Sequence, residues 1–231
     1  TDINLNIKNL NYDSSVEKHL IEMLNSKKGL VLVTGPTGSG KTTSLYSFIN
    51  CIDKKHNSII TIEDPVEYVI SDVSQVVVNG NSQLTFSSAL RNILRQDPNV
   101  IFIGEIRDNE TAIMACNMAM TGHLVLSSMH TNTIEGVIFR LLDMGVEAKS
   151  LVDSLLCIMN QRLVREVCPH CRKVTYIDEE NALKYGLNKG EVVYESSGCS
   201  ECNYTGYIGR ILIHDISVSY THLRAHETRS N

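Results

Sequence analysis

Eight residues, Gly35-Pro36-Thr37-Gly38-Ser39-Gly40-Lys41-Thr42, match the phosphate-binding pattern G-x-x-x-x-G-K-[ST]. They follow an apolar run of strand type, Gly29–Thr34, and precede a segment with helical spacing. In this setting glycines let backbone N–H groups turn toward phosphate oxygens, and the helix N-terminus carries partial positive charge. These residues and Thr43 are therefore predicted to bind a nucleotide, with Lys41 reaching its β- and γ-phosphates and Thr42 ligating Mg²⁺.

Short apolar runs and helical patterns alternate around this loop. The expected strands are Gly29–Thr34, Ser58–Ile62, Asp72–Val78, Val100–Ile103 and His123–Ser127. The expected helices are 16–28, Thr85–Arg95, Asn109–Met120 and a longer helical region from Glu135 to about Val167 that breaks near Gly145. Such alternation indicates an α/β fold with a largely parallel sheet, whose strands are buried on both faces.

Acidic residues follow two of the expected strands. Glu63 and Asp64 come after Ser58–Ile62, and Glu105 follows Val100–Ile103. The carboxyl ends of parallel strands form the ligand crevice of such a sheet, which places these carboxylates near the phosphate loop. One of them can polarise water while another holds Mg²⁺; the alternative is that they are solvated carboxylates at strand ends.

Two histidines flank the expected strand at 124–128. His123 precedes this run and His130 follows it. The alternation of side chains along a strand would place them on opposite sides, although a turn after Ser128 can return His130 to the crevice. Spacing alone leaves both a structural role and a nucleotide-contacting role open.

Four of the seven cysteines form two Cys-x-x-Cys pairs, and residues 172–198 separate the pairs. Four thiolates suit a tetrahedral Zn²⁺ site, so Cys168, Cys171, Cys199 and Cys202 are the predicted ligands. The alternative is a set of redox-active or free thiols. A module this small has little core, and metal binding would supply much of its stability.

Composition narrows the class of protein further. Hydrophobic residues make up 42% of the chain and charged residues 20%, as in a soluble globular protein. The apolar runs are far shorter than the roughly 20 residues of a membrane-spanning helix. A net charge of −5 disfavours nucleic acid as the main partner. The chain starts at Thr1 without a Met, so a preceding segment is expected, and the polar stretch 217–231 is expected to be loose or non-native.

Four segments resemble, in the same order, the motifs of the secretion ATPases that power type II secretion and type IV pilus assembly. They are Leu32–Thr43 (Walker A), Thr61–Tyr68 (Asp box), Ile103–Asp108 (Walker B) and Thr121–Asn132 (His box). The tetracysteine segment resembles the assembly and secretion branch of that family, and the retraction branch lacks it. Arg91, Arg95 and Arg210 also lie in segments similar to the family, although structural or surface roles are as compatible with them.

The resemblance implies a RecA-like P-loop NTPase core that works as a homo-hexamer in the cytoplasm, at the inner face of the membrane, with an inner-membrane platform protein as partner. It implies that Glu63 is the general base, that Glu105 acts with Mg²⁺ and water, and that His123 and His130 sense the γ-phosphate. Family members also carry an N-terminal domain that supplies arginines to the γ-phosphate. Without it, this chain is expected to bind ATP and hydrolyse it weakly.

The predicted organisation is therefore a RecA-like ATPase core at 1–160, a zinc-binding module with the start of a C-terminal region at 161–216, and a tail at 217–231. The expected function is an ATP-hydrolysing motor domain for pilus assembly or type II secretion. Two other functions remain open at this point: a nucleic-acid-dependent RecA-like translocase, and a nucleotide-gated interaction module without turnover.

Overall fold

A computed structural model describes residues 5–78 and 85–218 of the 231-residue chain. These residues divide into two compact units. Leu163–Ile211 forms the smaller unit, and the rest of the described chain forms the larger one. The phosphate-loop sequence lies in the larger unit and the four paired cysteines lie in the smaller.

The larger unit is built on a sheet in which strands adjacent in sequence are often apart in space. The strands of this sheet are β1 (Gly29–Thr34), β2 (Ile59–Glu63), β3 (Ser74–Val77), β4 (Val100–Ile103), β5 (Leu124–Met129), β6 (Leu155–Val167) and β9 (Tyr207–Val218), and β6 and β9 each continue into the smaller unit. Their order in the sheet is β3-β2-β4-β5-β1-β6-β9. The pairings of β1 with β5 and β6, and of β2 with β3 and β4, are parallel, as is that of β4 with β5. The predicted α/β fold with a largely parallel sheet is confirmed.

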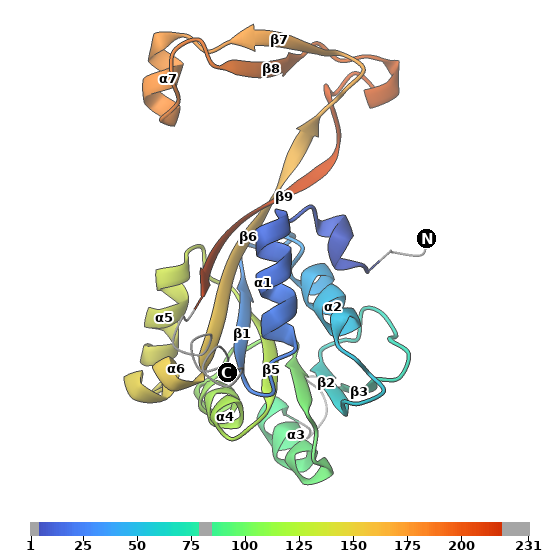
Figure 1. Cartoon of the computed structure of the whole chain (residues 1–231), viewed down its shortest axis with the longest axis vertical. Helices are drawn as coiled ribbons and strands as arrows, with labels where there is room; N and C mark the ends of the chain where they lie inside the picture. The colour runs from blue at the N-terminus through green and yellow to red at the C-terminus, as the bar shows by residue number, and fades with distance from the viewer. Residues whose placement is uncertain (1–4, 79–84, 219–231) are drawn as a thin grey trace, which may run out of the picture. The chain divides into compact units, whose positions relative to one another are not determined.

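Helices cover both faces of this sheet (Figure 1). They are α1 (Ser14–Leu24), α2 (Lys41–Cys51), α3 (Phe86–Ile93), α4 (Asn109–Met120), α5 (Ile134–Asp143) and α6 (Ala148–Ser154). Strand β1 shows how the faces are divided: Leu30 and Leu32 pack with residues of α3 to α6, whereas Val31 and Val33 pack with α1 and α2. This alternation follows from the two-residue period of a strand, and it buries β1 on both sides.

Side-chain caps define where several helices begin. Asp108 accepts a hydrogen bond from the backbone N–H of Thr111, and Thr133 accepts one from that of Gly136. Such caps satisfy N–H groups that have no partner within the helix. Helix α4 accordingly spans the residues predicted for it.

The predicted helical region from Glu135 to Val167 was wrong in its last third. Helix α5 ends at Asp143, α6 ends at Ser154, and β6 begins at Leu155 and pairs in parallel with β1. The break near Gly145 is present, with a φ of 82° at that residue. The buried run after Ser154 is apolar without a break, and such a run fits either a buried strand or a buried helix until its neighbours are known.

The smaller unit contains a two-stranded antiparallel sheet of β7 (Arg172–Tyr176) and β8 (Val192–Ser196), and the helix α7 (Glu179–Tyr185) between them in sequence. Asp178 caps α7 by accepting from the N–H of Asn181 at 2.8 Å. A two-stranded sheet alone is marginally stable in water, so a unit of this kind depends on a further source of stability.

The end of the described chain returns to the larger unit. Leu212, Ile216 and Val218 of β9 pack against the core cluster that contains α1 and α2. The expected tail at 217–231 lies outside the described residues from 219 onward, as do its His222 and His226. Within residues 5–78 and 85–218, no helix has both the length and the apolar character that crossing a membrane requires.

Candidate functional site

The phosphate loop connects the end of β1 to the start of α2, and three of its glycines have positive φ. Gly35 has a φ of 146°, Gly38 of 76° and Gly40 of 84°. A Cβ on Gly35 would lie 2.3 Å from the carbonyl oxygen of Gln161 and 2.7 Å from Ser39 Oγ, so a side chain does not fit there. Helix α2 begins directly after this loop, at Lys41. The strand, loop and helix predicted around the motif are all present.

Lys41 is buried over its own loop. Its Nζ donates to the carbonyl oxygens of Gly35 at 2.9 Å and Pro36 at 3.1 Å. Burial lowers the pKa of Lys41 from its usual value. The ammonium group is therefore already held against the first two residues of the phosphate loop.

A short chain of polar contacts joins Lys41 to Glu105. Lys41 Nζ lies 3.5 Å from Nδ1 of His130, and Nε2 of His130 lies 3.1 Å from Oε2 of Glu105, whose other oxygen pairs with Arg107. An ammonium can only donate, so Nδ1 accepts and the ring proton on Nε2 points to the carboxylate. Burial and the charges of Lys41 and Arg107 lower the pKa of His130, which favours the neutral ring that these contacts need.

The two predicted histidines lie at opposite ends of β5. His130 follows the end of β5 that is level with the end of β1, where the phosphate loop starts. His123 precedes β5 and contacts the carbonyl oxygen of Met118 through Nδ1 at 3.0 Å. Six strand residues between them correspond to about 20 Å. Within one chain the structure therefore brings His130, and not His123, to the loop.

Glu63 ends β2 with its carboxylate buried. It accepts hydrogen bonds from the hydroxyl of Tyr46, from Thr61 Oγ1 at 2.6 Å and from Gln75 Nε2 at 3.1 Å. Only 3% of the residue is exposed, whereas Asp64 beside it is exposed. The predicted role of Glu63 as a base remains a prediction, and these donors hold its carboxylate in the present conformation.

Thr42 faces a carboxylate that the sequence did not single out. Its Oγ1 donates to Oε1 of Glu67 at 3.1 Å, and the N–H of Glu67 is 3.3 Å from the hydroxyl of Tyr46. Glu67 lies within the segment that resembles the Asp box, so its position was visible in the sequence, but nothing there indicated this contact. An exposed carboxylate beside a hydroxyl is a combination that suits a hydrated Mg²⁺ ion.

One buried group in the loop fits an anion. Ser39 Oγ is buried and has no hydrogen-bond partner among the described residues. The loop therefore offers three kinds of group to an anion: the backbone N–H groups at the N-terminus of α2, the Ser39 hydroxyl and the Lys41 ammonium. The predicted phosphate-binding residues Gly35, Pro36, Thr37, Gly38, Ser39, Gly40, Lys41, Thr42 and Thr43 form the loop between β1 and α2 and the first turn of α2, and their contact with a nucleotide remains a prediction.

The paired cysteines of the smaller unit converge. The sulfur atoms of Cys168, Cys171, Cys199 and Cys202 all lie within 4.8 Å of one another. Three Sγ···Sγ separations are 3.9, 3.9 and 3.8 Å, far longer than a disulfide. Four sulfurs at about 2.3 Å from a central Zn²⁺ ion would be about 3.8 Å apart in a regular tetrahedron, so this geometry fits zinc.

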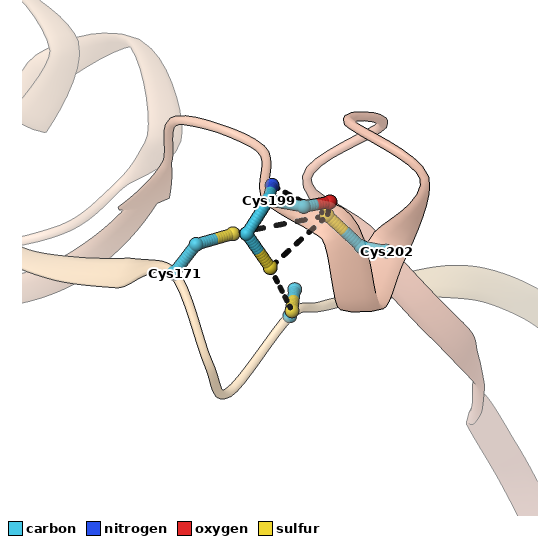
Figure 2. Close-up of side chains that lie close together, drawn as sticks. Cys171, Cys199 and Cys202 are labelled. Atoms are coloured by element: carbon cyan, nitrogen blue, oxygen red, sulfur yellow. Dashed lines mark hydrogen bonds between the residues drawn. The ribbon is translucent and has the colours of Figure 1, made fainter.

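The surroundings of these thiols favour the thiolate form at one position. Burial raises the pKa of Cys202, but the backbone N–H groups of Cys199 and Gly206, which lie 3.1 and 3.2 Å from its sulfur, together with the thiols of Cys199 and Cys171, bring the pKa down to about 6. Figure 2 shows the sulfurs of Cys171, Cys199 and Cys202 turned toward one another. A thiolate is the form that binds metal.

A comparison with known families gives this geometry a context. The family model described as Type II/IV secretion system protein matches residues 1–230. The chain belongs to this family. A type II secretion system protein E from Klebsiella pneumoniae is 45% identical over 214 residues, which cover 93% of this chain and 43% of that protein. A type II secretion system ATPase E from Vibrio cholerae is 44% identical over 196 residues, or 84% of this chain and 39% of that protein.

A solved structure of the family has the same fold. The pilus retraction motor PilT with bound ADP matches with a TM-score of 0.64 and 31% identity, over 96% of this chain and 58% of that one. The chain thus spans less than half the length of both curated relatives and somewhat more than half of PilT. The secretion ATPase family predicted from the four motifs is confirmed.

Proposed function

We propose that this chain is the ATP-hydrolysing motor domain of a machine for type II secretion or type IV pilus assembly. The observation that carries the proposal is the polar chain from Lys41 through His130 to Glu105 at the mouth of the phosphate loop. A lysine beside a loop of N–H donors can neutralise charge on phosphate oxygens, and a carboxylate held close to it can orient the attacking water.

Each residue has a distinct role in this proposal. Lys41 would contact the β- and γ-phosphates in place of the carbonyl oxygens of Gly35 and Pro36, and the hydroxyl of Thr42 would help to hold Mg²⁺. When bound, Mg²⁺ neutralises charge that develops on the phosphate oxygens. Glu105 would orient the attacking water and help to hold Mg²⁺, His130 would sense the γ-phosphate, and Glu63 would accept the proton of the attacking water once its present donors release it.

The partners and location follow from the family. The full-length protein is proposed to act as a homo-hexamer in the cytoplasm, at the inner face of the cytoplasmic membrane, on an inner-membrane platform protein. His123, which lies far from the loop of its own chain, would contact a nucleotide only across such a subunit interface. The tetracysteine unit, proposed to hold Zn²⁺, favours a machine that assembles or exports over one that retracts.

The test is nucleotide binding and phosphate release by the purified chain with Mg-ATP. Lys41→Ala should abolish both, and Glu105→Gln should preserve binding while lowering turnover by about 100-fold, because it keeps the shape and removes the charge that orients water. Lys149→Ala, at an exposed position of α6, is the matched control and should behave like the parent.

The outcomes separate the alternative functions. ATP binding or turnover unaffected by Lys41→Ala contradicts the motor proposal. Tight ATP binding with weak phosphate release that Glu105→Gln does not lower further supports a nucleotide-gated interaction module instead. Stimulation of turnover by single-stranded DNA supports a translocase.

A further inference from the structure

Gln161 is a buried amide on β6 that lies directly behind the phosphate loop. The last residue of β1, Thr34, pairs with Asn160, so Gln161 stands one residue further along, level with Gly35. Its side chain is buried, and only 1% of the residue is exposed. A buried amide is costly unless it is hydrogen-bonded, so its partners indicate what holds it there.

Both ends of this amide contact the nucleotide loop or the helix after it. Nε2 donates to the carbonyl oxygen of Ser39 at 2.9 Å, and Oε1 accepts from Ser44 Oγ at 3.0 Å. The backbone oxygen of Gln161 fills the space that a Cβ on Gly35 would need. Gln161 therefore contacts the loop at Gly35 and at the Ser39–Gly40 peptide group, and it contacts the first turn of α2 at Ser44.

The contact with Ser39 determines where a phosphate-binding group points. In a trans peptide the C=O and the following N–H are antiparallel. When Gln161 holds the oxygen of Ser39, the N–H of Gly40 points away from β6, to the other side of the loop. Gly40 has a φ of 84°, in the left-handed region, so this peptide also depends on an outside contact to keep its orientation.

We propose that Gln161 is a positioning residue of the nucleotide site, which sets the orientation of the Ser39–Gly40 peptide for the β-phosphate. The inference rests on the proposed function, because it concerns the same phosphate loop. Gln161 touches neither the nucleotide nor water in this proposal, and it acts only through Ser39 and Ser44.

The test compares ADP and AMP binding to the whole chain by isothermal titration. Gln161→Glu keeps the size and the acceptor for Ser44, but it turns an oxygen toward the carbonyl oxygen of Ser39. Loss of this buried donor should weaken ADP binding about tenfold. AMP lacks the β-phosphate, so its affinity should change by less than about threefold, and the preference for ADP over AMP should fall.

Two further variants keep the result interpretable. Gln161→Met removes both hydrogen bonds without adding a charge and should show the same loss of preference for ADP. Asn160→Asp makes the same amide-to-acid change one residue earlier, where the amide donates to the carbonyl oxygen of Asn132, and should leave the preference for ADP unchanged. Thermal unfolding without nucleotide shows that each variant is folded at the assay temperature.

Parent-like ADP affinity in folded Gln161→Met would overturn the inference, as would an equal loss of ADP and AMP affinity. A parent chain that binds no ADP would overturn the proposed function, and the inference with it. Weaker ADP binding in both Gln161 variants, with the preference for ADP reduced, supports the inference.

Discussion

Removing the hydroxyl of Tyr46 should destabilise the larger unit more than its loss of one oxygen atom suggests. Tyr46 is fully buried, its hydroxyl donates to Glu63, and the backbone N–H groups of Glu67 and Tyr68 lie 3.3 and 3.5 Å from the same oxygen. Burial and the neighbouring Glu63 raise the pKa of Tyr46, so the hydroxyl keeps its proton as a donor. Tyr46→Phe leaves a buried carboxylate with one donor fewer.

A hydrogen bond to a charged group contributes about 1.5–3 kcal/mol, and the two longer N–H contacts contribute less. Tyr46→Phe should therefore lower the free energy of unfolding by about 2 kcal/mol, which corresponds to about 4–8 °C in Tm for a unit of this size. Far-UV circular dichroism during heating and urea titration measures both. Tyr12→Phe is the matched control, because that hydroxyl donates to the weak acceptor Met159 Sδ, and it should cost about 0.5 kcal/mol.

The same contact predicts coupling between two residues. Since Tyr46 and Glu63 belong to one buried hydrogen-bonded group, the effects of Tyr46→Phe and Glu63→Gln should not add in the double variant. If Tyr46→Phe costs no more than Tyr12→Phe, or if the two effects add, the buried carboxylate does not depend on Tyr46, and the reasoning about how Glu63 is held is refuted.

Two other predictions concern the metal unit and the histidine. The chain should bind about one Zn²⁺, and Cys202→Ser should lower the zinc content measured by plasma mass spectrometry by more than about half, whereas Cys51→Ser should not; equal zinc in both variants contradicts the site. The pKa of His130 is lowered by burial, Lys41 and Arg107, so the unfolded chain takes up the proton first as pH falls. The associated stability is present above about pH 6.5 and is lost as pH falls through the lowered pKa. His130→Gln should flatten this part of a profile of Tm against pH, and a profile as steep as that of the parent argues against the assignment.

The sequence predicted those parts of the fold whose signals are local. The strands β1 and β4 and the helix α4 have the bounds expected from apolar runs, a glycine loop and helical spacing. The order of strands in the sheet was not predictable, because pairing depends on neighbours distant in sequence. For the same reason β6 was mistaken for helix: only its pairing with β1 distinguishes the two.

The candidate site shows the same division. The loop residues and Glu105 follow from motif and position, but the three donors to Glu63 come from α2, β2 and β3, and no local pattern places Gln75 or Tyr46 beside it. His123 belongs to the segment that resembles the His box, yet the length of β5 separates it from the phosphate loop. Gln161 carried no signal, because a glutamine after an apolar run is ordinary until its partners are known.

The way Lys41 is held has a thermodynamic consequence. Its ammonium group already has two carbonyl oxygens and an imidazole nitrogen as neighbours. A phosphate oxygen arriving at this group does not replace bulk water but displaces protein acceptors, so each new contact is offset by one that is broken. Nucleotide association at this loop is therefore an exchange of ligands around a fixed cation, with a smaller heat of binding than the count of final contacts would imply.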